Sequence, residues 1–306
     1  MRPATDAISV TMSKELEPRR FVAPPTASAA PTQSAPPAAP VRTVSGYSLP
    51  GEGSSSVISA VTIAALFGVW WLITALGWLP PLVLPPPEAV WRAFVDGMAG
   101  RLQGGRSLVE HFGWSFGRVF VAFWAAFLTA VPIGILMGVS RVVRGIFDPP
   151  IEFYRPLPPL AYLPLIIIWF GIDEASKIIL IYLACFAPLA VAARAGVRSV
   201  TVEQINAAAS MGASRSQIVR YVILPAALPE ILTGMRIAIG FGWTTLVAAE
   251  MVAATAGLGQ MVLNASNFLR TDVVIMGIVV IGVVAYLFDL LMRQIEAWLV
   301  PWKGKM

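Results

Sequence analysis

The feature that most constrains this chain is an apolar run over residues 57–76 that contains no charged side chain. At 1.5 Å per residue, a helix over this run spans about 30 Å, the thickness of the hydrocarbon core of a bilayer. Only 13% of the residues in the chain are charged and 57% are hydrophobic, whereas a soluble domain carries about 25% charged residues. Much of the surface must therefore face lipid, and the chain is predicted to be an integral membrane protein.

Five further apolar runs follow and are interpreted as additional spans. The six predicted spans are about 57–76, 113–139, 156–172, 176–194, 231–254 and 273–298. The third run is unusual because it contains Pro156, Pro158, Pro159 and Pro164. Non-helical backbone at membrane depth persists only inside protein or along a wet cavity. We therefore expect this run to begin as broken backbone and to lie in the interior.

Six spans place both ends of the chain on one side of the membrane. Lys and Arg are retained in cytoplasmic loops, and the loops after the second and fourth spans carry Arg141, Arg144, Arg194 and Arg198. Both termini are therefore predicted to be cytoplasmic. The net charge of +5 is interpreted in the same way, and not as a surface that binds nucleic acid.

The first 50 residues differ in composition from the rest of the chain. They are rich in Pro, Ala, Ser and Thr and carry few large apolar side chains. Such a segment cannot bury enough apolar surface to offset its ordering entropy. Residues 1–50 are predicted to form a disordered cytoplasmic tail, and residues 51–306 the transmembrane domain.

Charged side chains occur within or beside the predicted spans at Arg118, Arg236, Glu250 and Asp289. A charge at the centre of a membrane helix costs about 2.5–3.5 kcal/mol, which makes such residues functional candidates by default. For Arg118, Arg236 and Asp289 the alternatives are an interhelical pair or snorkelling near a helix end. Glu250 lies near the predicted outer end of the fifth span and is a candidate for a gate or a docking contact.

The remaining residues of chemical interest favour structural interpretations. Cys185 and His111 are the only residues of their types, so they form neither a disulfide nor a metal site by spacing. We interpret them as a packed thiol and an interfacial histidine. Trp70, Trp71 and Trp78 are typical of an aromatic belt at the membrane interface. No catalytic residue and no metal-binding residue is predicted.

The longest polar interruption among the later spans is the segment 199–225. Residues 206–211 favour a helix of small side chains, and Gly212 is expected to stop or bend it. A second short helix is expected over 214–222, ended by Pro225. The segment is thus predicted to be a compact cytoplasmic helix–turn–helix. The alternative is a solvated loop that only joins two spans.

This segment resembles a motif of a known family. Asn206-Ala207-Ala208, Gly212 and Leu224-Pro225 are similar in sequence and spacing to the "EAA…G…LP" loop of the permease subunits of ATP-binding-cassette (ABC) importers. In that family the loop forms a coupling helix that docks on the cytoplasmic ATPase. The resemblance assigns this docking role to Asn206, Ala207, Ala208, Ala209, Gly212, Ala213, Leu224 and Pro225. Asn206 replaces the glutamate of the family, which puts in doubt any ion pair made by that glutamate.

The resemblance extends over nearly all of the chain after the tail. Residues 154–165 and 168–171 look like the branch of permeases that serves nitrate, sulfonates and taurine. Residues 229–236, 242–250 and 271–274 look closest to the taurine permeases. The resemblance implies taurine as the substrate, with another sulfonate, nitrate or a similar small anion as the alternative.

The resemblance also implies an architecture and a set of partners. The expected fold is an all-α, six-span type I ABC importer permease of the bacterial inner membrane. The expected partners are a second copy of the chain, a dimer of cytoplasmic ATPase subunits, a periplasmic substrate-binding protein and the lipid bilayer. The chain contains no G-x-x-x-x-G-K-[ST] motif, so ATP and Mg²⁺ are expected on the ATPase and no cofactor on this chain. It is therefore not expected to be an enzyme itself.

Several side chains in the spans are candidates for lining the pathway of the substrate: Tyr154, Pro158, Trp169, Trp243, Thr244, Thr245 and Glu250. The threonines have an alternative, because a threonine in a membrane helix often bonds its own helix or a neighbour.

Two other functional classes are alternatives for a multi-span chain. A secondary transporter or channel would need an ion-coupling site, usually with midplane carboxylates or repeated halves. A membrane enzyme would need clustered catalytic side chains. The sequence shows no internal repeat and a single histidine, which disfavours both.

Overall fold

The computed structural model describes residues 56–102 and 104–301, and every regular element in that part of the chain is a helix. The elements are α1 (Ser56–Ala75), α2 (Pro87–Met98), α3 (Leu108–Val139), α4 (Arg141–Tyr154), α5 (Pro159–Phe170), α6 (Glu174–Arg198), α7 (Val202–Ser210), α8 (Arg215–Ile218), the π-helical turn η1 (Val219–Ile223), α9 (Leu224–Ala253), α10 (Leu258–Asn267) and α11 (Thr271–Leu299). The prediction of an all-helical fold is confirmed for these residues. The predicted tail, residues 1–50, lies outside them.

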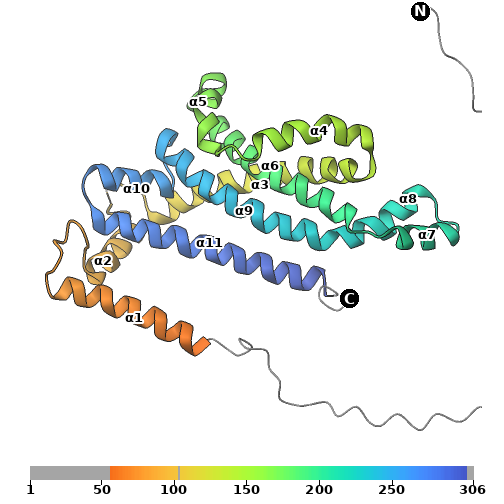
Figure 1. Ribbon diagram of the computed structural model, residues 1–306. Coiled ribbons are helices and arrows are strands. Elements are labelled where there is room, and N and C mark those ends of the chain that lie inside the picture. Colours follow the sequence, from red (N-terminus) through yellow and green to blue (C-terminus); the bar gives the residue numbers. More distant parts are fainter. Residues whose placement is uncertain (1–55, 103, 302–306) are drawn as a thin grey trace, which may run out of the picture. The chain divides into compact units, whose positions relative to one another are not determined.

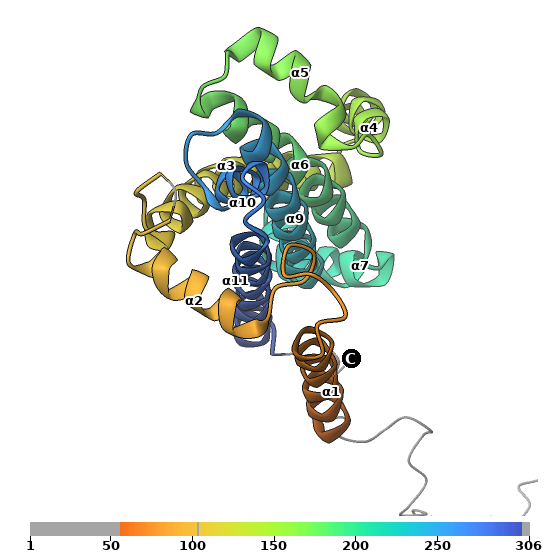
Figure 2. The ribbon, with the colours of Figure 1, turned by 90° about the vertical axis from the view of Figure 1, so that its left-hand side faces the viewer.

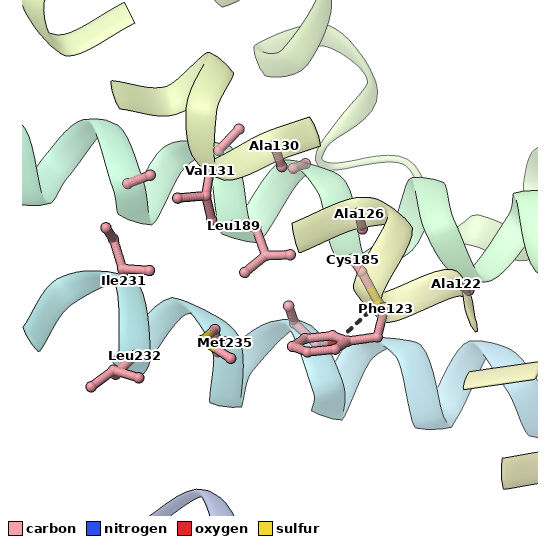
Figure 3. Packing of buried hydrophobic residues seen from close by; sticks show 14 of the residues in the cluster. Ala122, Phe123, Ala126, Ala130, Val131, Cys185, Leu189, Ile231, Leu232 and Met235 are labelled. Atoms are coloured by element: carbon pink, nitrogen blue, oxygen red, sulfur yellow. Dashed lines mark hydrogen bonds between the residues drawn. The ribbon is translucent and has the colours of Figure 1, made fainter. Parts of the chain in front are cut away.

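The centre of the bundle is formed by α3, α6 and α9, which lie side by side (Figure 1). Figure 3 shows their shared core, in which Ala126 and Ala130 of α3, Leu189 of α6, and Ile231 and Met235 of α9 are buried. Lipid tails are as apolar as leucine, so burial in a bilayer supplies little hydrophobic driving force between helices. Close packing of small residues takes its place, and the alanines of α3 provide it.

Two glycines show how closely these helices approach one another. A Cβ atom added at Gly134 of α3 would collide with the backbone carbonyl of Ala190 in α6, and one added at Gly234 of α9 would collide with the Ala192 side chain. Cys185 lies in the same core, fully buried, and its Sγ atom donates to the Ala238 carbonyl oxygen at 3.3 Å. Its interpretation as a packed thiol is confirmed.

The helices α3 and α6 run in the same direction along the bundle. Arg118 bonds Glu174 toward the start of both helices, and Gly134 lies against Ala190 farther along both. The intervening pair, α4 and α5, is bent by 105° and returns the chain from one end of the bundle to the other (Figure 1). Five described helices are long and apolar enough to cross a membrane, or six spans if the bent pair counts as one.

The first helix, α1, differs from the others because none of its apolar span is buried. It is held near its C-terminal end by Trp70, whose Nε1–H donates to the Pro85 carbonyl at 3.1 Å, and by Trp71, whose Nε1–H donates to Glu88 Oε1 at 3.2 Å. The end-on view of Figure 2 shows α1 standing away from the core helices. Its free face is therefore available to lipid or to another chain.

One expectation about the loop was wrong, because Pro225 does not end a helix. It lies in the first turn of α9, and α8, η1 and α9 together form one apolar stretch from Arg215 to Ala253. The π-helical turn explains the continuity, since the Leu224 N–H reaches back five residues to the Val219 carbonyl. Such a widened turn accommodates a proline ring that would clash with the carbonyl four residues earlier in a regular α-helix.

Candidate functional site

Two short helices, α7 and α8, form a hairpin at the end of the bundle opposite α10 (Figure 1). Each begins with a capping box. The Gln204 N–H donates to Thr201 Oγ1 at 3.4 Å, and the Thr201 N–H donates to Gln204 Oε1 at 3.1 Å. Ser214 and Gln217 repeat this arrangement at α8, at 3.4 and 2.8 Å. Backbone donors that a helix start leaves open are thereby satisfied within the hairpin.

The acidic residue at the start of α7 adds to this local order. Glu203 is exposed and lies outside the candidate spans. Hydrogen bonds from its own backbone N–H and from the Thr201 hydroxyl hold the pKa of its carboxyl group below the usual value. A carboxylate in the first turn also complements the positive end of the helix dipole.

Gly212 ends α7, as the sequence predicted. Its φ of +83° is in the left-handed region, which glycine adopts without steric cost. The Gly212 N–H donates to the Ala209 carbonyl at 2.9 Å and the Ala213 N–H to the Ala208 carbonyl at 3.1 Å. This is a Schellman motif. No atom lies within 4 Å of a Cβ built on Gly212, so the turn is open to a partner surface.

The residues assigned to docking by resemblance are divided between the surface and the interior of the hairpin. Asn206, Ala207 and Ala209 are exposed, and Ala208 is buried. Leu224 and Pro225 lie in the first turn of α9. Sequence reasoning missed two large apolar side chains, Val202 (65% exposed) and Met211 (83% exposed). Little in the sequence distinguishes them, because Ile205 and Ile218 of the same hairpin are also large and apolar but only partly exposed.

A cavity of about 490 Å³ lies between the bend that joins α4 to α5 and the facing sides of α6 and α9. We call it the elbow cavity. Residues 154–159 line one wall, and Glu230, Thr233 and Phe241 of α9 line another. The predicted pathway residues Tyr154 and Pro158 are among its lining residues. The backbone is broken before Pro159, as predicted, and it borders this cavity. The prediction that the run 156–172 lies in the interior is wrong for the described chain, because residues 156–158 and most of α5 are exposed and only Leu163 and Ile166 of α5 are buried.

The other predicted pathway residues lie elsewhere. Trp243 and Thr244 line a second cavity of about 520 Å³ between α9 and α11. Thr244 Oγ1 donates to the Gly240 and Phe241 carbonyls of its own helix, at 3.3 and 3.0 Å, which is the alternative that the sequence left open. Thr245 is buried. Trp169 is 66% exposed on α5 and lines neither of these cavities.

Glu250 lines none of the cavities described above, because it is fully buried in a polar network at the α10 end of the bundle. Its carboxylate accepts hydrogen bonds from Ser115 Oγ at 2.7 Å, from Arg118 Nη1 at 2.7 Å and from the Gly259 N–H at 2.9 Å. Arg118 also donates to both carboxylate oxygens of Glu174, at 2.6 and 2.8 Å. The buried guanidinium is therefore paired with two acids on different helices.

The same network holds the start of α10. The Leu258 N–H donates to Ser115 Oγ at 2.8 Å, and the Gly257 N–H donates to His111 Nδ1 at 3.1 Å. Gly257 itself has a φ of +135°, and a Cβ atom there would collide with the Glu250 carboxyl group. Side chains of α3 and α9 thus cap a helix that follows them in the chain. His111 is a buried member of this network, where the sequence suggested an interfacial residue.

Ion pairs also join helices toward the α7 end. Arg236 of α9 bonds Asp289 of α11 at 3.0 Å, and Arg194 of α6 pairs with Asp148 of α4. For Arg118, Arg236 and Asp289 the structure selects the interhelical pair among the interpretations open from sequence. Within residues 56–102 and 104–301, no three His, Cys, Asp or Glu side chains come together as a metal site would require.

Comparison with known proteins identifies the class to which this fold and hairpin belong. Residues 130–301 match the family described as "Binding-protein-dependent transport system inner membrane component". The match covers more than half of the chain and includes the α7–α8 hairpin, the elbow cavity and α11. The chain belongs to this family and is a permease subunit of an ABC importer. The resemblance predicted from residues 206–225 is confirmed at the level of the family.

Individual relatives narrow the branch. The chain is 53% identical over 250 residues to the taurine transport system permease protein TauC of Escherichia coli K12, covering 81% of this chain and 90% of TauC. It is 35% identical over 237 residues to the putative aliphatic sulfonates transport permease protein SsuC of the same organism, covering 78% and 88%. Both belong to the branch indicated by the sequence.

Solved structures agree with the fold. A chain of the MetNI methionine ABC transporter, solved in inward-facing conformations, matches with a TM-score of 0.55 and 22% identity. The match covers 63% of this chain and 95% of that chain. At this identity the likeness concerns the fold alone. The predicted class, a multi-pass permease of the type I ABC importer fold, is confirmed.

Proposed function

We propose that this chain forms the membrane-spanning part of an importer that moves taurine across the bacterial inner membrane. The observation that carries the proposal is the 53% identity to TauC over 81% of the chain. The transporter would contain two copies of this chain, two cytoplasmic ATPase subunits that bind ATP and Mg²⁺, and a periplasmic protein that delivers taurine. Both chain termini and the α7–α8 hairpin would lie on the cytoplasmic side.

In this proposal the α7–α8 hairpin docks in the ATPase and transmits its movement to the bundle. Its capped helices, open turn and exposed Met211 suit a rigid docking element. The hairpin continues through η1 into α9, whose side chains line the elbow cavity. Movement of the hairpin would therefore act directly on a wall of the cavity, as a rigid-body change between two states.

The proposal is tested by uptake. The chain would be expressed with its ATPase and binding protein in a host that lacks taurine uptake, and accumulation of labelled taurine measured in intact cells. We expect uptake that requires all three components. Absence of taurine uptake, with all three components present at normal levels, would show that the substrate assignment is wrong.

A second candidate substrate is an aliphatic sulfonate without an amino group, supported by the 35% identity to SsuC. The same cells distinguish it when taurine is replaced by ethanesulfonate. We expect taurine to be taken up faster. Faster uptake of ethanesulfonate would favour the second candidate.

A further inference from the structure

The elbow cavity carries charged groups on two of its walls. Glu230 belongs to α9, and Arg155 lies at the end of α4, at the bend. Glu230 is exposed and forms no ion pair with any other described residue. Arg155 has one ion pair, at 3.7 Å to Glu152, in which both side chains are about half exposed. Such a pair is weak, because solvent screens it.

Two other carboxylates of the bundle are each paired with an arginine. Asp148 of α4 pairs with Arg194, and Asp289 of α11 pairs with Arg236. These acids join helices, whereas Glu230 joins nothing among the described residues. An unpaired carboxylate beside apolar walls formed by Leu183, Val191 and Phe241 is stabilised by water that solvates it or by a cation that neutralises it. This position is therefore suited to a ligand that carries a positive charge.

The cavity wall has a third polar group. Tyr154 lines the cavity, and its hydroxyl oxygen is buried without a hydrogen-bond partner in the described part of the chain. A buried hydroxyl without a partner is unfavourable by about 1–3 kcal/mol. A ligand with several acceptor oxygens, entering beside Arg155, would offer this hydroxyl a partner after a small rotation of the ring.

We propose that the elbow cavity is a binding site for a small zwitterion, whose cationic group lies against Glu230 and whose anionic group lies against Arg155 and Tyr154. This inference rests on the proposed function, since taurine is such a zwitterion, with an ammonium group and a sulfonate two carbons apart. A cavity of about 490 Å³ is larger than so small a molecule requires. Half-exposed charges bind weakly, which suits a pathway from which the substrate must leave.

The test is direct binding to the permease–ATPase complex in lipid nanodiscs, without the binding protein. Two probes are compared by saturation-transfer NMR: taurine, and ethanesulfonate, which keeps the sulfonate and lacks the ammonium. Glu230→Gln is expected to weaken taurine binding about tenfold and to leave ethanesulfonate binding unchanged. Arg155→Gln is expected to weaken both. Glu230→Asp keeps the charge and should retain the preference for taurine.

Matched controls are Asp173→Asn, just before the first turn of α6, and Arg141→Gln on α4, since both residues are exposed and line no part of this cavity. They should leave both affinities unchanged. The proposal is overturned if the wild-type complex does not bind taurine, or if Glu230→Gln, eluting as an intact complex, retains the wild-type preference. Failure of the proposed function is distinguished from failure of this binding site, because it appears as absence of taurine uptake by the complete transporter.

Discussion

The α10 end of the bundle and the elbow cavity both contain charged side chains, but they use them in opposite ways. At the α10 end, Arg118 and Glu250 are buried and bonded to each other, and Glu174 pairs with both Arg118 and Lys177, so the two acids are balanced by two basic groups. At the elbow cavity, Glu230 has no ion pair in the described residues and Arg155 has only a half-exposed one. A satisfied network fixes helices in place, whereas unsatisfied groups beside a cavity are available to a passing solute.

The difference follows from the cost of burying charge. A buried ion pair contributes little net stability, but removing one partner leaves an uncompensated charge that is strongly destabilising. Glu230 and Arg155 at the cavity are exposed, so changing them should affect the solute more than the fold. This contrast can be tested by substitutions at both places.

The largest effect is expected from Arg118→Ala, which leaves Glu250 buried without its guanidinium. We expect a loss of about 3–5 kcal/mol of stability, measured by thermal unfolding of the purified permease in detergent. Arg293→Ala is the matched control, because its side chain is 61% exposed in its pair with Asp289, and it should leave the unfolding midpoint unchanged. Equal effects of the two substitutions on the unfolding midpoint would contradict the claim that the buried pair matters more to stability than the exposed one.

A smaller effect is expected from Gly257→Ala. The backbone at this position is one that only glycine adopts easily, at a cost of about 1–3 kcal/mol for other residues, and the added Cβ would collide with Glu250. We expect a loss near the upper end of that range in the same unfolding assay. Gly212→Ala is the comparison, because its φ is also positive but its surroundings are open. A loss of about 1–2 kcal/mol is expected there, and an equal or greater loss than for Gly257→Ala would contradict the structure.

The smallest effect is expected from Thr244→Val. The hydroxyl of Thr244 bonds only carbonyls of its own helix among the described residues, and valine keeps its shape. We expect taurine uptake within about twofold of the wild type and stability within about 0.5 kcal/mol. A strong loss of uptake at normal protein levels would place Thr244 on the pathway. The second cavity, between α9 and α11, would then also be open to the solute.

The sequence predicted the helical membrane fold, because a long apolar run without charges has few stable structures other than a membrane-spanning helix. It also predicted the turn at Gly212 and the family, from residues 206–225. It did not predict the π turn before Pro225, since a proline that ends a helix and a proline that follows a widened turn look alike in one sequence. The two capping boxes, at Thr201 and Ser214, were readable and were missed.

The buried network could not be predicted from the sequence. Ser115 and Arg118 of α3 are far along the chain from Glu174 of α6 and Glu250 of α9, and these side chains meet only after the three helices pack. Sequence reasoning singled out Glu250 for its charge and assigned it to a gate or the pathway, because a lone carboxylate gives no sign of its partners. Glu230 was not among the predicted pathway residues, because it lies just outside the apolar run of the fifth predicted span.

The central claim is that this chain transmits work from an ATPase that it does not contain, through the α7–α8 hairpin. The most direct measurement is ATP-dependent taurine accumulation in proteoliposomes that contain the permease, the ATPase and the binding protein, comparing Gly212→Asp with Gly212→Asn. Both side chains tolerate a positive φ, but only aspartate adds a charge to the open turn. We predict that Gly212→Asp abolishes accumulation and ATPase association while the permease remains inserted, and that Gly212→Asn retains most of both. Normal accumulation by Gly212→Asp at normal levels would contradict the claim.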